Sequence, residues 1–314
     1  MSRTVLGLDT SNYTTSVAAF DGVDGRNCGK LLDVPEGTLG LRQSDALFQH
    51  VKRLPELIET LCAQEDLRTI RAVGASTRPR AVEGSYMPCF LAGTSQAQVL
   101  AGVLKVPFFA CSHQQGHLAA AAWSAGHMEL LDQPFLAWHL SGGTTELLYV
   151  QPEGCNVSAR IIGGTSDISA GQLIDRTGGL LGVPFPAGKA LDAMCRDGKA
   201  VKPFRVKLQG LEFSLSGMEN KVRELVQKGE EPSAVARFAL DTVVDVVVRA
   251  TRQAQKEFPG LSVLCSGGVA SNSRLRQAME GECGAIFAKP EYSTDNGMGV
   301  AILTHRALER GALV

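Results

Sequence analysis

The chain has 314 residues, of which 44% are hydrophobic and 20% charged, and its 31 Lys and Arg against 32 Asp and Glu leave a net charge of −1. This length suits two ordinary globular domains, and the charge balance excludes a general attraction to nucleic acid, so any RNA contact would need a local basic patch or a partner. The first residues lack the pattern of a signal peptide and no stretch has the ~20 apolar residues of a membrane helix, so we expect a cytoplasmic protein that does not enter a membrane.

Three segments combine a short apolar strand with a turn of small residues. Residues 5–20 predict two strands around a polar turn, and residues 135–150 repeat that pattern around Gly142-Gly143. Residues 261–279 predict a buried strand, the turn Gly267-Gly268 and a helix. Short runs rich in β-branched and aromatic side chains are typical of strands. Because the hairpin recurs in the second half of the chain, the pattern indicates two related lobes.

Helical patterns lie between these strands. Apolar residues at helical spacing predict helices over 44–64, 93–106 and 234–258. Residues 22–43 and 76–90 are rich in Gly, Pro and charge, which is typical of surface loops. The alternation of strands and helices predicts an α/β protein. We place the lobe boundary near residue 130. The lobes then cover 1–130 and 131–296, and a C-terminal helix within 297–314 packs back on the first.

Two histidines suggest a metal site. His113-Gln-Gln-Gly-His117 follows the apolar run VPFFAC and precedes LAAAAW, a good helix former. The i,i+4 spacing puts both imidazoles on one helix face, where they can bind one metal ion or simply be polar residues near a helix start. Gln114 stands where the zinc proteases carry their general-base Glu, so the motif is not theirs. Asp295, which precedes another helix, is either that helix's N-cap or an oxygen ligand completing a His/His/Asp site.

Glycine-rich turns and carboxylates suggest a nucleotide site. Ser-Gly-Gly occurs at 141–143 and again at 266–268, and such turns present backbone N–H groups to phosphate or carboxylate oxygens. One turn in each lobe would hold a nucleotide in a cleft. The segment 167–194 places Asp167, Asp175 and Asp192 around a helix and a Pro-Gly loop. Asp167 and Asp175 are expected about two turns apart on one helix face. These carboxylates either take ribose hydroxyls or form a solvated face.

Together these motifs carry a family resemblance. His113-x-x-Gly-His117, SGGTTEL, SAGQLID with GVPFPAGKALD, SGGVASN and YSTDNG follow the order and spacing of the tRNA threonylcarbamoyladenosine synthase family, formerly labelled glycoproteases. The chain resembles that family over essentially its whole length. The resemblance implies an actin-like, sugar-kinase-type fold: a duplicated, two-lobed α/β protein with a central nucleotide cleft. It also implies an acyltransferase that moves a threonylcarbamoyl group from threonylcarbamoyl-AMP to adenosine of tRNA.

The resemblance also implies ligands and partners. An iron or zinc ion would be held by His113, His117 and Asp295. An adenine nucleotide (threonylcarbamoyl-AMP, AMP or ATP) would be bound by His139, Leu140, Ser141, Gly142, Gly143, Asp175, Gly188, Asp192 and Asn272. The implied partners are tRNA and companion subunits of the threonylcarbamoyl pathway, and a homodimer is a further expectation.

The chain departs from the family at three places. STRPRAVEGSYM (76–87) stands where a Gly-Pro-Gly loop is usual, Asn12-Tyr13-Thr14 where acidic residues are usual, and Thr144 where a histidine is usual. These changes are typical of a diverged paralogue. The 76–90 loop follows a buried strand, so we expect it to reach toward the metal site, with Arg78 and Arg80 able to pair with an anion. Two alternatives therefore stay open: a carbamoyl or acyl transferase with a small-molecule acceptor, and a non-catalytic paralogue that binds metal and nucleotide.

Overall fold

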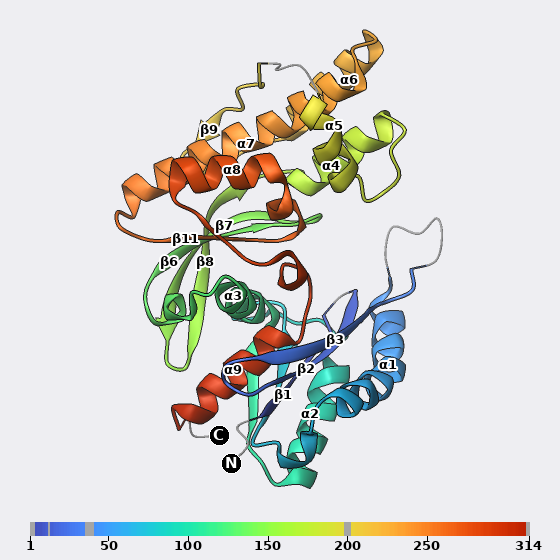
Figure 1. Ribbon diagram of the computed structural model, residues 1–314, viewed down its shortest axis with the longest axis vertical. Coiled ribbons are helices and arrows are strands. Elements are labelled where there is room, and N and C mark those ends of the chain that lie inside the picture. Colours follow the sequence, from blue (N-terminus) through green and yellow to red (C-terminus); the bar gives the residue numbers. More distant parts are fainter. Residues whose placement is uncertain (1–3, 12, 35–40, 198–201, 312–314) are drawn as a thin grey trace. The chain divides into compact units, whose positions relative to one another are not determined.

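The computed structural model describes residues 4–11, 13–34, 41–197 and 202–311 (Figure 1). The chain divides into two compact units. Unit 1 comprises Met1–Gln133, Gln151–Ala159 and Thr294–Val314, and unit 2 comprises Pro134–Val150 and Arg160–Ser293. The segment after Thr294 thus packs with the N-terminal part of the chain, far from it in sequence.

A five-stranded sheet forms the centre of unit 1. Its strands are β1 (Val5–Asp9), β2 (Thr14–Phe20), β3 (Gly25–Leu31), β4 (Val73–Arg78) and β5 (Phe108–Ser112), in the order β3-β2-β1-β4-β5. The first three form an antiparallel meander, whereas β4 and β5 run parallel to β1. The carboxyl ends of β1, β4 and β5 therefore lie at one edge of the sheet, where functional side chains gather in α/β folds.

Helices cover both faces of this sheet (Figure 1). They are α1 (Gln43–Gln64), α2 (Phe90–Leu104), α3 (His113–Ser124) and α9 (Met298–Glu309), with 3₁₀ turns at Leu67–Thr69 and Met128–Asp132. Successive side chains of a strand point to opposite faces. Leu6 and Leu8 accordingly join the core made with α1 and α2, whereas a Cβ on Gly7 would lie 2.3 Å from the backbone nitrogen of Ala301 in α9.

Unit 2 repeats the same strand plan. Its sheet has the order β12-β11-β6-β7-β8-β10-β9, and residues 151–159 of β7 and β8 are the part of this sheet that groups with unit 1. The strands are β6 (Phe135–Leu140), β7 (Thr145–Glu153), β8 (Asn156–Thr165), β9 (Leu208–Gln209), β10 (Glu212–Phe213), β11 (Val263–Ser266) and β12 (Ile286–Phe287). The part β8-β7-β6-β11-β12 matches β3-β2-β1-β4-β5 of unit 1, with β11 parallel to both β6 and β12. The fold is a duplication, as predicted.

The helices of unit 2 pack around a large apolar core. They are α4 (Ala170–Leu180), α5 (Gly188–Asp197), α6 (Ser216–Gln227), α7 (Pro232–Glu257) and α8 (Ser273–Cys283), with 3₁₀ turns at Gly268–Ser271 and Pro290–Tyr292. The long helix α7 contributes many buried valines and alanines to that core. Trp138 of β6 is fully buried and donates its indole N–H to the Thr251 hydroxyl of α7, at 2.8 Å. This bond pairs a polar atom that would otherwise be costly to bury.

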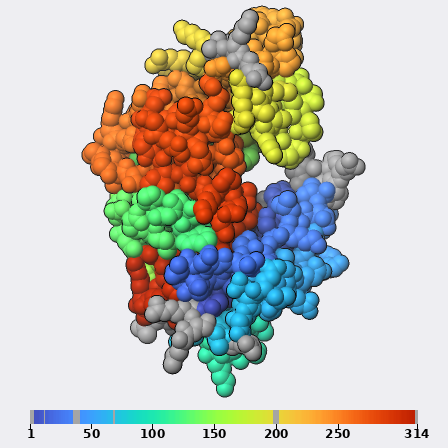
Figure 2. All heavy atoms as spheres, in the orientation of Figure 1, coloured from blue at the N-terminus to red at the C-terminus, as the bar shows by residue number. Residues whose placement is uncertain are grey.

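The predicted hairpins at 5–20 and 135–150 are confirmed, as are the three predicted helices, which form α1, α2 and α7. The prediction of a loop throughout 22–43 is wrong, because Gly25–Leu31 forms the edge strand β3. Residues 35–40 of that segment lie outside the described part of the chain. β3 pairs through its backbone with β2, while most of its side chains are exposed, so its sequence carries no apolar alternation (Figure 2).

No helix in the described ranges is long and apolar enough to cross a bilayer.

Candidate functional site

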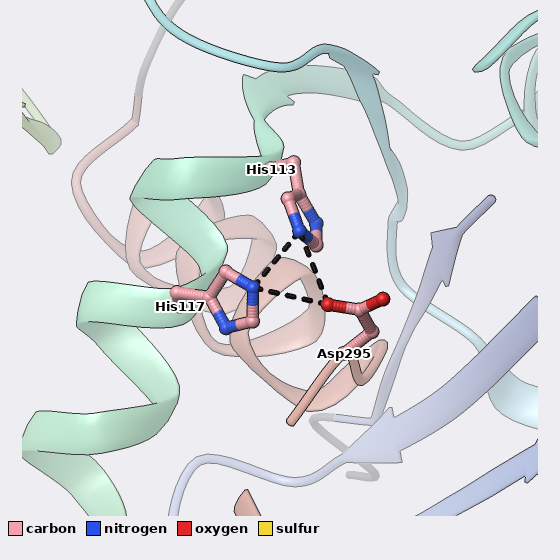
Figure 3. Close-up of side chains that lie close together, drawn as sticks. All are labelled: His113, His117 and Asp295. Atoms are coloured by element: carbon pink, nitrogen blue, oxygen red, sulfur yellow. Dashed lines mark hydrogen bonds and ion pairs between the residues drawn. The ribbon is translucent and has the colours of Figure 1, made fainter. Parts of the chain in front are cut away.

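Helix α3 supplies both histidines of the predicted metal site. Its start is fixed by a capping box: the Ser112 hydroxyl accepts the Gln115 backbone N–H at 3.2 Å, and the Gln115 side chain accepts the Ser112 N–H at 2.8 Å. The helix therefore begins at His113, immediately after β5, and the i,i+4 pair shares one face. The two Nε2 atoms lie 2.8 Å apart (Figure 3).

Asp295 comes to these histidines from a segment nearly two hundred residues away in the sequence. Its Oδ1 lies 3.4 Å from His113 Nε2 and 3.3 Å from His117 Nε2 (Figure 3). The alternative that Asp295 caps α9 is wrong, because the helix begins after Gly297 and Asn296 Oδ1 accepts the Gly299 N–H at 3.3 Å. Because Asn296, and not Asp295, accepts this N–H at the start of α9, the Asp295 carboxylate is available to the histidines.

Two glycines allow α3 and α9 to touch. A Cβ on Gly299 would lie 1.8 Å from the carbonyl oxygen of Gly116, far inside van der Waals contact. Gly116 lies between the two histidines, and Gly299 follows Asp295 by four residues. The missing side chains thus let the helix backbones approach closely enough to bring the carboxylate to the imidazoles.

A second carboxylate, that of Asp9, faces His113 from the other side. Its Oδ1 lies 3.1 Å from His113 Nδ1. Burial by itself would lower the pKa of His113, but the charges and hydrogen bonds of Asp9 and Asp295 raise it to about 10. Burial would raise the pKa of Asp295, but hydrogen bonds from the two histidines hold it well below its usual value. The sequence reasoning missed Asp9, although an Asp ending the apolar run VLGLD is a visible signal.

The arrangement fits a divalent metal ion. Two imidazole nitrogens and one carboxylate oxygen point at a common position, and all three ligand atoms lie within 4.8 Å of one another. Bonds of roughly 2.0–2.2 Å to one ion would separate neighbouring ligand atoms by about 2.8–3.6 Å, for octahedral to tetrahedral angles. The separations of 2.8, 3.3 and 3.4 Å between the three ligand atoms lie within that range. His113, His117 and Asp295 therefore form a group able to hold a metal.

A separate pocket of about 480 Å³ lies within unit 2, a size suited to a small organic ligand. It is lined by Gly142, Gly171, Ile174, Asp175, Pro186, Gly188, Lys189, Asp192, Gly268, Val269, Ser271 and Asn272. Five of the nine predicted nucleotide residues are in this lining. The other four lie in β6 and its following turn: the Leu140 side chain is buried in the core, while His139, Ser141 and Gly143 are outside the lining. The apolar residues and Lys189 were not predicted from the sequence.

Both Ser-Gly-Gly turns belong to unit 2, so the prediction of one turn per lobe is wrong. They follow β6 and β11, which are neighbouring parallel strands. Gly267 has a φ of 101°, and a Cβ there would lie 2.2 Å from the Leu140 carbonyl oxygen. Glycine therefore permits the two strand ends to meet, and Gly142 and Gly268 both reach the pocket wall.

The carboxylates of the pocket are held by neighbouring donors. Asp175 Oδ1 accepts the Ala187 N–H at 2.8 Å, and Asp192 Oδ1 accepts from Asn272 Nδ2 at 2.8 Å. The expectation that Asp167 and Asp175 share a helix face is wrong, because Ser169 caps α4 and leaves Asp167 outside the helix. Asp167 instead accepts the Leu215 N–H at 2.8 Å just before α6, which is a structural role.

Comparison with known proteins relates the chain to one family. Residues 40–302 match the family described as tRNA N6-adenosine threonylcarbamoyltransferase. A protein of that name from Thermus thermophilus is 33% identical over 98% of this chain and 94% of its own length, and one from Streptococcus suis is 31% identical over 95% of each. Among solved structures, full-length HypF in a phosphate- and nucleotide-bound form matches 97% of this chain and 47% of its own, with 16% identity and a TM-score of 0.64.

A second solved structure shows the same structural similarity. Component A of the Acidaminococcus fermentans (R)-2-hydroxyglutaryl-CoA dehydratase matches 98% of this chain and 99% of its own, with 16% identity and a TM-score of 0.57. These neighbours have the actin-like fold, which confirms the predicted fold class.

Proposed function

Because the chain belongs to the tRNA N6-adenosine threonylcarbamoyltransferase family, we propose that it transfers a threonylcarbamoyl group from threonylcarbamoyl-AMP to the exocyclic amine of adenosine in tRNA. Family membership over nearly the whole chain carries this proposal. The convergence of His113, His117 and Asp295 supports it, because a site for a metal is what the proposed chemistry requires.

In this proposal the three residues hold one divalent ion, iron or zinc. A bound ion would supply Lewis-acid polarisation of the carbonyl that is attacked. The protein's own contribution is to keep both imidazoles and the carboxylate aimed at one position, through the capped start of α3 and the close approach of α9. Such fixed geometry avoids reorganisation when the substrate binds.

The pocket of unit 2 is the proposed adenine-nucleotide site. Ile174, Pro186 and Val269 offer apolar surface to a base, and the open glycine turns offer backbone groups to polar atoms. Asp175 has one carboxylate oxygen engaged by Ala187, so the other is the proposed partner of a ribose hydroxyl. Lys189 brings a positive charge to the wall, which suits a phosphorylated ligand.

Reconstituted transfer tests the proposal. Threonine, bicarbonate and ATP would be supplied together with companion proteins of the pathway, and the tRNA nucleosides then analysed by mass spectrometry. We expect threonylcarbamoyladenosine to form with the wild type and not with His117→Ala. Binding of metal and nucleotide without any transfer would instead identify a non-catalytic paralogue.

A small-molecule acceptor is the second candidate, and one observation favours it. The Pro79 carbonyl accepts the Gln114 N–H at 3.0 Å, so the unusual loop 79–89 begins directly beside His113. Arg78 is exposed at the end of β4, and it precedes this loop. Arg78 and Arg80, on either side of Pro79, would favour a small anionic acceptor at this position. Transfer to small amines but not to tRNA would establish this candidate.

A further inference from the structure

We propose that Asp9 is a positioning residue that fixes the orientation and tautomer of His113 for metal binding. The inference rests on the proposed metal site, but it concerns a residue that is not itself among the three ligands. Asp9 ends β1 and is fully buried, whereas the histidine that it contacts begins α3, after β5. The contact therefore joins the end of β1 to the helix that follows β5, and β4 lies between β1 and β5 in the sheet.

Three donors hold the Asp9 carboxylate. The Ser11 hydroxyl donates to Oδ2 at 2.8 Å, and the Ser76 hydroxyl, from the neighbouring strand β4, donates to Oδ1. His113 Nδ1 is the third partner, at 3.1 Å. A buried carboxylate is costly unless its oxygens are hydrogen-bonded, and these contacts meet that need. They also leave the carboxylate little freedom to move, so it is a rigid reference point for the ring.

The contact with Asp9 sets the tautomer of His113. An ionised carboxylate only accepts hydrogen bonds, so the proton of a neutral His113 ring must sit on Nδ1. The lone pair then lies on Nε2, which is the atom facing His117 and Asp295. A ligand histidine whose other nitrogen donates to a carboxylate has a fixed ring and a more basic ligand atom. Asp9 thus prepares the nitrogen that the metal needs.

A purely structural role for Asp9 is the competing explanation, since the carboxylate also ties β1 to β4 through Ser76. The two explanations differ in what Asp9→Asn should do. The amide keeps the size of the side chain, and its oxygen can still accept from Ser76 and His113, so the fold is retained. The substitution removes the negative charge that strengthens the contact and keeps the Nδ1 proton in place.

The test is to measure Co²⁺ and Zn²⁺ affinity of the metal-free full-length protein, by chelator competition and by the visible spectrum of the Co²⁺ form. We expect Asp9→Asn to weaken metal affinity about 10–100-fold. Asp167→Asn is the matched control, because Asp167 also accepts several hydrogen bonds but serves the start of α6. The control should bind metal as the wild type does.

A second readout follows the His113 ring by ¹⁵N NMR of the Zn²⁺ form. We expect a protonated Nδ1 and a metal-bound Nε2 in the wild type, and loss of the protected Nδ1 proton in Asp9→Ala. If Asp9→Asn binds both ions as tightly as the wild type, with an unchanged Co²⁺ spectrum, Asp9 is structural and the inference is wrong. If the wild type itself binds neither ion, the proposed metal site fails instead, so the two failures are distinguishable.

Discussion

Replacing Gly299 by Ala tests how the metal site is assembled. The added Cβ would lie 1.8 Å from the Gly116 carbonyl oxygen and 2.4 Å from its carbonyl carbon. Ordinary contact begins near 3.4 Å, so α3 and α9 must separate locally by roughly 1.6 Å, an overpacking that typically costs about 1–3 kcal/mol. A displacement of that size is large against a metal–ligand bond of about 2.0–2.2 Å. We therefore expect at least tenfold weaker metal affinity.

The assay combines thermal unfolding of the metal-free protein with metal titration of the folded variant. Gly102→Ala is a suitable control in the same unit, because Gly102 lies inside α2 and its Cβ would meet nothing within 4 Å. That change should stabilise the protein by about 0.5–1 kcal/mol and leave the metal affinity unaltered. If Gly299→Ala binds metal within twofold of the wild type, the close approach of the helices is not what assembles the site.

Three further outcomes are expected. His117→Ala should lose the metal but keep the fold, as judged by metal analysis and circular dichroism. If the variant still binds one metal ion per chain, His117 is not a ligand. Metal binding should release about one proton per chain near pH 8, because the metal-free His113 has a pKa of about 10 and its Nε2 must lose a proton to bind. Metal affinity should accordingly rise with pH until about 10, and calorimetry in buffers of different ionisation enthalpy measures the release. Asp175→Ala should weaken AMP binding by about 1–3 kcal/mol. Equal AMP affinities of the variant and the wild type in calorimetry would contradict this.

The sequence predicted the parts of the fold that have a strong local signal. Hydrophobic periodicity located α1, α2 and α7, and the apolar runs located the hairpins of both units. The i,i+4 histidines could be placed on one face because helix geometry alone determines that spacing. Asp295 could be named from the sequence only as a helix N-cap or a metal ligand, and the family resemblance favoured the ligand. Nothing local indicates which distant segment will pack beside α3.

The features that were missed depend on contacts between distant strands. The side chains of β3 are mostly exposed and of mixed polarity, so they give no strand pattern in the sequence. Backbone pairing with β2, and not burial, makes this segment a strand. The two Ser-Gly-Gly turns were assigned to different lobes, whereas the parallel pairing of β6 and β11 puts both in unit 2. The contact between Asp9 and His113 likewise depends on β1, β4 and β5 ending at one edge of a sheet, which no single segment specifies.

Titration of the metal-free protein with Fe²⁺ or Zn²⁺, while transfer to tRNA is followed, tests the central claim most directly. We expect threonylcarbamoyladenosine formation to rise in proportion to added metal and to stop rising at about one ion per chain, as for a single three-ligand site. His117→Ala should show no such rise. Equal transfer by the metal-free and metal-loaded protein, or full metal-dependent activity in His117→Ala, would contradict the claim that His113, His117 and Asp295 hold the metal used in transfer.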